Sequence, residues 1–182
     1  MKLTRASLAI AAFAAAIAVP GVSQAAPDGT ITFKGNISAQ TCTVSGNGGG
    51  KDFTVTLPSV SVSTLWAAGQ VSGRTPFTIA LTNCSTKTGV VHTFFEAGPT
   101  TNQEIGTLIL QDANAAKNVQ VQLLNADHSP IKAGAEDASQ GDKKVSLVDG
   151  NAKLQYYAQY YATGAAGAGP ANTQVMYTMA YE

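Results

Sequence analysis

Few side chains in this sequence could carry acid–base or metal chemistry. Histidine occurs only at His92 and His128, whereas a Ser-His-Asp hydrolase or a zinc or copper site needs histidine in a defined arrangement. His92 lies in the strand-like run VVHTFFE and His128 in the turn-like run NADHSP. We therefore expect two surface or boundary histidines with satisfied hydrogen bonds, no enzyme activity, no metal and no cofactor.

Two loops resemble ligand-binding motifs but lack the required spacing. In SGNGGGKD, Ser45 occupies the first glycine position of a phosphate-binding loop and Asp52 replaces the hydroxyl that binds magnesium. Glu136, Asp137 and Asp142 do not follow the EF-hand spacing, and two lysines come directly after them. Solvated loops are the favoured interpretation of both stretches.

The tyrosine-rich run LQYYAQYYATG allows two interpretations. Tyr156 and Tyr160 fall on one face of a strand, whereas Tyr157, Gln159 and Tyr161 fall on the other. The first face is typical of a core and the second of a partly wet surface. A carbohydrate platform on the second face is the alternative, although strand tyrosines more often serve packing.

The N-terminal residues have the features of a secretory signal peptide. Lys2 and Arg5 precede an uncharged run, then Pro20-Gly21, and small residues at Ser23 and Ala25 have the spacing that signal peptidases require. Cleavage after Ala25 would leave 157 of the 182 residues, with 9 basic and 11 acidic side chains. This balance gives no electrostatic basis for nucleic-acid binding.

The two cysteines are expected to form a disulfide. Cys42 and Cys84 both lie in the exported part of the chain, and an oxidising compartment favours an intramolecular bridge. Neither has the Cys or His neighbours of a metal or redox site, so a reactive thiol is the disfavoured alternative.

The rest of the chain predicts strands, because short alternating runs of Thr, Val, Tyr and Ile are separated by Gly, Asn, Asp and Pro. This texture favours an all-β sandwich of the immunoglobulin kind. One helical turn is expected over 64–68, capped by Ser63 and ended by Gly69. The predicted strands are 30–38, 40–45, 53–57, 75–82, 90–96, 107–111, 118–124, 144–148, 153–162 and 173–181.

The last predicted strand raises the question of its partner. Val175, Tyr177, Met179 and Tyr181 share one face. A terminal strand usually forms a sheet edge, and soluble proteins protect apolar edges with charge or proline. Neither occurs from Thr173 to Tyr181.

Read together, the two ends resemble the subunits of chaperone-usher fimbriae, especially the major pilins of the type 1 fimbrial family. The matching features are the alternating DGTITFKGNI ahead of Cys42, GRTPFTIALTNC leading into Cys84, and the aromatic run with its Gly/Ala loop, YYAQYYATGAAGAGPAN. In addition, Tyr181 is the penultimate residue and Gly169 is fourteenth from the C-terminus, where that family's chaperone-recognition motif has Tyr and Gly.

The resemblance implies an immunoglobulin-like pilin domain over 38–182 that lacks its last strand. A donor strand from the neighbouring subunit would complete it, after a periplasmic chaperone and an outer-membrane usher have handled the subunit. It implies a donor extension over 26–37, following a signal peptide over 1–25. The donor-strand residues would be Gly29, Ile31 and Phe33. The chaperone or acceptor edge would comprise Gly169, Val175, Tyr177, Met179 and Tyr181.

The predicted function is therefore a structural subunit of a surface fimbria that supports cell adhesion. It would be exported through the periplasm and would polymerise with copies of itself and sibling subunits. The alternatives are a minor or adaptor subunit, or a tip adhesin that binds a host receptor or carbohydrate. An adhesin resembles two fused domains, whereas one domain's length follows the donor segment here.

Overall fold

The computed structural model describes residues 29–33, 37 and 39–182, and the predicted signal peptide 1–25 lies outside them. The chain divides into two units, Met1–Asn36 and Ile37–Glu182. The fold that follows is that of the second unit. Its elements are β1 (Thr43–Gly46), the 3-10 helix η1 (Val62–Leu65), β2 (Val71–Thr82), β3 (Gly89–Phe95), β4 (Leu108–Ile109), β5 (Val119–Asn125), β6 (Pro130–Ile131), α1 (Asp137–Gln140), β7 (Val145–Leu147), β8 (Ala152–Ala162) and β9 (Tyr177–Tyr181).

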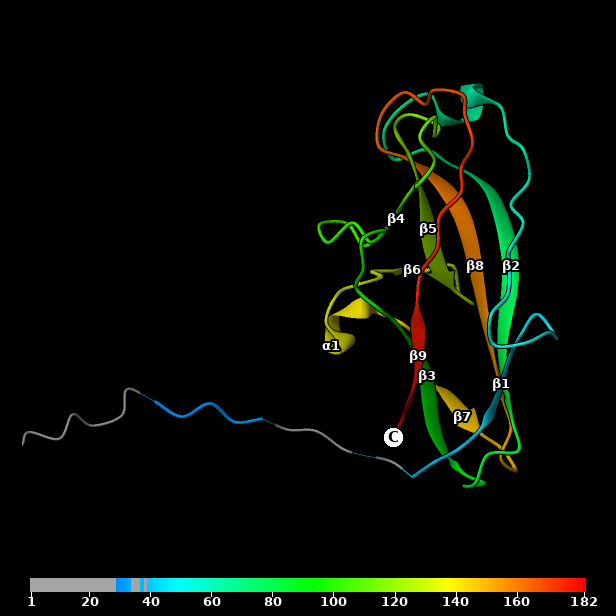
Figure 1. The fold of residues 1–182 in the computed structure, drawn as a ribbon, viewed down its shortest axis with the longest axis vertical. Helices are drawn as coiled ribbons and strands as arrows, with labels where there is room; N and C mark the ends of the chain where they lie inside the picture. The colour runs from blue at the N-terminus through cyan, green and yellow to red at the C-terminus, as the bar shows by residue number, and fades with distance from the viewer. Residues whose placement is uncertain (1–28, 34–36, 38) are drawn as a thin grey trace, which may run out of the picture. The chain divides into compact units, whose positions relative to one another are not determined.

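The strands form two antiparallel sheets (Figure 1). The larger has the order β1-β2-β8-β5-β4, with β6 beside β5, and the smaller has the order β7-β3-β9. This arrangement confirms the predicted all-β class. The long central strands β2 and β8 pair with Phe77 opposite Tyr156.

The core lies between the two sheets because alternate residues of each strand face inward. On β8, Leu154, Tyr156 and Ala158 are buried, whereas Lys153 is exposed. The smaller sheet contributes Val91 and Phe95 from β3 and Leu147 from β7 to the same cluster. The rings of Phe95 and Tyr156 meet edge to face across the core at 5.5 Å between centroids.

The two helical elements are short. Ser61, rather than the predicted Ser63, caps η1, and its side-chain oxygen accepts a hydrogen bond from the backbone N–H of Ser63. No sequence pattern indicated α1, where the buried Gln140 side chain bonds both the N–H and the C=O of Phe95 on β3. No helix among the described residues is long and apolar enough to cross a membrane.

Most predicted strands shift by a few residues at their ends, and three stretches predicted as strand have none. Residues 53–57 form no strand, and the last strand begins at Tyr177 instead of Thr173. Residues 30–33 and 37, the described part of the first predicted strand, have no strand either. All three stretches alternate as strands do, but a ladder also needs a hydrogen-bonding partner.

Cys42 and Cys84 are joined by a disulfide. The bond ties the residue before β1 to the end of β2, and the backbone N–H of Ser85 donates to the C=O of Thr41 beside it. The 42-residue loop that the bond closes contains the whole segment from β1 to β2.

We expect the double variant Cys42→Ser/Cys84→Ser to lose about 4 kcal/mol of unfolding free energy, because the unfolded chain regains the entropy of an open loop. Periplasmic accumulation and the urea midpoint should both fall. Intact-mass measurement after alkylation in denaturant should count two thiols in wild type with reductant and none without it. Two alkylated thiols in the unreduced sample would contradict the bond.

Candidate functional site

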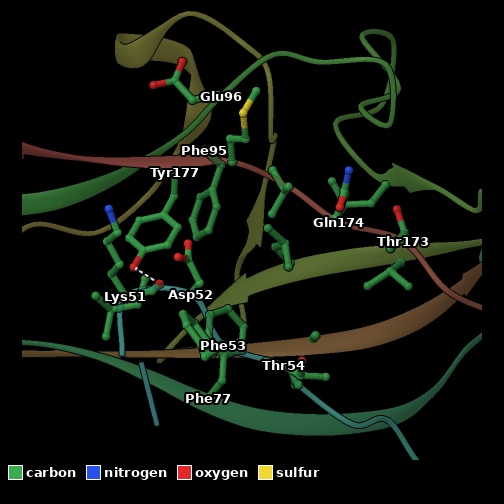
Figure 2. A pocket seen from close by; sticks show the side chains of 18 of the residues that line it. Lys51, Asp52, Phe53, Thr54, Phe77, Phe95, Glu96, Thr173, Gln174 and Tyr177 are labelled. Carbon is green, nitrogen blue, oxygen red and sulfur yellow. Dashed lines mark hydrogen bonds between the residues drawn. The ribbon is translucent and has the colours of Figure 1, made fainter. Parts of the chain in front are cut away.

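A large groove lies between the two sheets, with a volume of about 1490 Å³ (Figure 2). This volume exceeds the roughly 300–1,000 Å³ of most small-molecule pockets, so an extended ligand fits it better. Its floor comes from inward-facing residues of β2, β5 and β8, namely Phe77, Ile79, Val121, Leu123, Ala158 and Tyr160. The two sides of the groove are segments outside the larger sheet.

The first side, here called the N-terminal lip, is the stretch 51–57. Phe53, Val55 and Leu57 are half-buried and pack against the core, whereas Thr54 and Thr56 are exposed. This is the burial pattern of a strand with one apolar face. Among the described residues, however, none hydrogen-bonds to the backbone of 53–57. The segment therefore has strand-like side-chain alternation without a strand partner.

The second side, here called the C-terminal lip, comprises residues 171–176 and continues into β9. Three of its carbonyls accept hydrogen bonds, from Gln111 N–H to Asn172, from Thr100 Oγ1 to Gln174 and from Glu96 N–H to Met176. Successive residues of an extended chain point their backbone groups to opposite sides.

The backbone groups of Thr173 and Val175 thus lie on the other side of this lip. No described residue bonds to them. The two lips therefore present two backbone edges without partners, on either side of an apolar floor. In Figure 1 the traces of 51–57 and 171–176 run along opposite sides of the strands β8 and β2.

Aromatic rings crowd one part of the groove (Figure 2). Phe53 lies between Phe77 and Tyr177, with ring centroids 6.1 and 6.3 Å apart. Burial raises the pKa of the Tyr177 hydroxyl, and the nearby Asp52 adds to this effect. Burial also raises the pKa of Tyr181. Both hydroxyls are therefore neutral hydrogen-bond donors at physiological pH.

The structure brings most of the predicted edge residues together. Val175, Tyr177, Met179 and Tyr181 all line the groove and are half-buried. Gly169 lies elsewhere, in a separate cavity of about 350 Å³ beside η1. A Cβ on Gly169 would come within 2.6 Å of Ala116 N and Asn114 O. Only glycine permits this contact between the loop and the turn before β5.

The predicted donor-strand residues belong to the first unit, and they are exposed. Ile31 is 80% exposed and Phe33 is 90% exposed, while Gly29 has nothing within 4 Å of the place its Cβ would take. Large apolar side chains at such exposure are candidates for burial against a partner.

The N-terminal lip is the part of the site that sequence analysis missed. The alternation of Phe53, Val55 and Leu57 predicts a strand, but nothing in the sequence marks this stretch as one side of a groove. The sequence signal available for this lip was the alternation of apolar side chains followed directly by Pro58.

The structure corrects the expectations for His92 and Asp142. His92 is buried, at 2% exposure, rather than at the surface, and its Nδ1 lies 2.5 Å from Asp142 Oδ2. Asp142 is half-buried, with its side chain only 6% exposed rather than solvated, whereas Asp137, 3.7 Å from the same nitrogen, is exposed. These three residues could together offer ligands to a metal ion. The short His92–Asp142 hydrogen bond already occupies Nδ1 and ties the segment after α1 to β3.

His128 lies in a turn, as predicted, with φ of 65°. Its ring meets Tyr157 edge to face at 4.6 Å between centroids. On the same outer sheet face, Gln159 is buried and bonds to both Arg74 and Gln122. The outward face of the tyrosine-rich strand is thus held by contacts with β2, with β5 and with the turn after β5.

Comparison with known proteins identifies the family. A family model described as "Type-1 fimbrial protein, A" matches residues 57–182. The chain is 50% identical over 161 residues to the major fimbrial subunit SMF-1 of Stenotrophomonas maltophilia (strain K279a), covering 86% of this chain and 94% of that protein. It is 45% identical over 160 residues to the F17 fimbrial protein of Escherichia coli, covering 85% and 88% respectively.

Solved structures show the same fold. A chaperone-usher pilus structure aligns with a TM-score of 0.60 at 22% identity, covering 92% of this chain and 100% of that one. The P pilus rod subunit PapA aligns with a TM-score of 0.57 at 22% identity, covering 78% and 99%. On the family match and these relatives, the chain belongs to the type-1 fimbrial protein family and is a structural subunit of an extracellular fimbria.

Proposed function

We propose that this fimbrial subunit polymerises by accepting, in its groove, an extended strand from a neighbouring chain. The observation that carries the proposal is the pair of unpartnered backbone edges that face each other across an apolar floor. A strand laid between them would find hydrogen-bond partners on both sides and a place for every second side chain below. Strand addition of this kind is known from chaperone–pilin complexes.

The segment 26–37 of the next copy is the proposed donor. Gly29, Ile31 and Phe33 lie on one face of its alternating pattern, and the exposed Ile31 and Phe33 are unfavourable in water. Burying these two side chains would contribute about 3–6 kcal/mol. Each main-chain hydrogen bond to a lip would add about 0.5–1.5 kcal/mol.

Before a neighbour arrives, the open groove is an aggregation hazard. We assign its temporary protection to a periplasmic chaperone that binds along Val175, Tyr177, Met179 and Tyr181, and its exchange to an outer-membrane usher. Gly169 would affect this edge only indirectly, through the loop that contains it. Its loop is held by a hydrogen bond from Ala116 N–H to the C=O of Pro170, directly before the C-terminal lip.

A subunit that donates at one end and accepts in a groove elsewhere makes a heterologous contact. Such contacts do not close on themselves, so they propagate as a filament. This architecture supports the role of a repeating rod subunit, and we propose no enzymatic activity for it.

The first prediction concerns the donor segment. Phe33→Asp should leave the domain folded, disulfide-bonded and able to bind the chaperone, but should abolish incorporation into filaments, because a charge cannot be desolvated in the neighbour's groove. Thr32→Asp is the matched control, since it adds the same charge on the opposite face.

Two measurements decide this prediction: the melting temperature of the purified chaperone complex and the filament yield at the cell surface. Wild-type filament yield from Phe33→Asp would refute strand donation. A large fall in its melting temperature would instead make 26–37 part of its own domain's core.

The second prediction concerns the C-terminal edge. Tyr177→Asp/Tyr181→Asp places two charges on the groove side of β9, so the subunit should be degraded or aggregate in the periplasm. Met176→Asp is the control, because Met176 is 66% exposed on the opposite face. Soluble chaperone-bound subunit is measured by pull-down. Normal secretion of the double variant would show that this edge is not the chaperone-binding surface.

A further inference from the structure

One side chain spans the mouth of the empty groove. Tyr177, at the start of β9, reaches the opposite side, where its hydroxyl donates a 2.7 Å hydrogen bond to the C=O of Lys51 (Figure 2). Its ring meets Phe53 of the same lip edge to face. Among the described residues, this is the one hydrogen bond that joins the N-terminal lip to the C-terminal lip and β9.

The position of Phe53 is itself built into the fold. Phe53 lies against Gly46 at the end of β1, where an added Cβ would be 1.9 Å from the ring carbon Cδ1. Gly46 therefore leaves the space that the Phe53 ring occupies, which a larger residue would fill. From there Phe53 contacts both Phe77 on the groove floor and Tyr177 across the mouth.

The Lys51 carbonyl is a backbone acceptor that points toward the groove, because a side chain from the opposite lip reaches it. A strand that enters between the lips must pair with backbone groups of this kind. The Tyr177 hydroxyl and the incoming strand thus compete for one acceptor, and the Tyr177 and Phe53 rings lie across the path between the lips.

We propose that Tyr177, through its hydrogen bond to Lys51, is a latch that closes the empty acceptor groove and must open before a donor strand can be fully seated. This inference rests on the proposed function, since it assumes that the groove accepts a strand. The latch satisfies an otherwise unpartnered edge carbonyl in the empty subunit. It also raises the free-energy barrier to strand insertion, because the contact has to be broken first.

The test uses Tyr177→Phe, which removes the hydroxyl and keeps the ring. Tyr161→Phe is the matched control, because it removes a tyrosine hydroxyl from the outer face of β8, and Tyr161 does not line the groove. The purified mature chain is refolded from denaturant at a fixed concentration. Polymerisation is then followed by light scattering and by electron microscopy of the products.

We expect Tyr177→Phe to polymerise between about twofold and about tenfold faster than wild type, which is the rate equivalent of one neutral hydrogen bond. Tyr161→Phe should polymerise at the wild-type rate. Phe53→Leu, which removes the ring contact, should also accelerate polymerisation. An unchanged or slower rate for Tyr177→Phe, or equal acceleration by Tyr161→Phe, would overturn the latch.

The chain carrying Phe33→Asp separates failure of the latch from failure of the proposed function. If it polymerises like wild type, strand donation itself is wrong, whatever Tyr177 does. If it stays monomeric while Tyr177→Phe matches wild type, strand donation stands and the latch is wrong. Circular dichroism of each variant before assembly verifies that rates are compared between folded chains.

Discussion

Every backbone N–H and C=O removed from water needs a hydrogen-bond partner, and this requirement governs the structure. Most strands meet it within the chain, through the ladders of two antiparallel sheets. Among the described residues, no partner bonds to the backbone of 53–57 or to the backbone groups of Thr173 and Val175. Because they face each other across a floor that includes Phe77, Ile79 and Val121, the unmet requirement is concentrated at one groove. A fimbrial subunit that assembles with other copies can meet it through its neighbour.

The remainder of the domain compensates for the open groove. The Cys42–Cys84 bond ties β1 to the end of β2, and the Phe95–Tyr156 contact joins the two sheets beneath the groove. The Gln140 amide hydrogen-bonds both backbone groups of Phe95, as a neighbouring strand would. The buried His92–Asp142 pair anchors the same segment to β3. None of these contacts uses a residue of either lip, so the addition of a strand at the lips would leave them intact.

The groove also explains why strand-like sequence and observed strand differ here. Phe53, Val55 and Leu57 alternate as well as any strand in the chain, and Val175 continues the pattern of β9. Side-chain alternation reports which face is buried, and Phe53, Val55, Leu57 and Val175 are all half-buried. Strand assignment depends on backbone bonds to a second segment, which the described part of this chain does not supply.

The sequence by itself determined the all-β class, the long strands β2 and β8, the pairing of the only two cysteines and the family, because these follow from local periodicity, composition and motifs. It also marked Val175, Tyr177, Met179 and Tyr181 as one face. Tertiary structure alone decided that Phe53 lies across from Tyr177, that Gly169 is needed for close packing against Ala116, and that His92 is buried on Asp142. Tyr177 and Lys51 are 126 residues apart. Their contact depends on how two sheets are stacked, and no local pattern of side chains specifies that stacking.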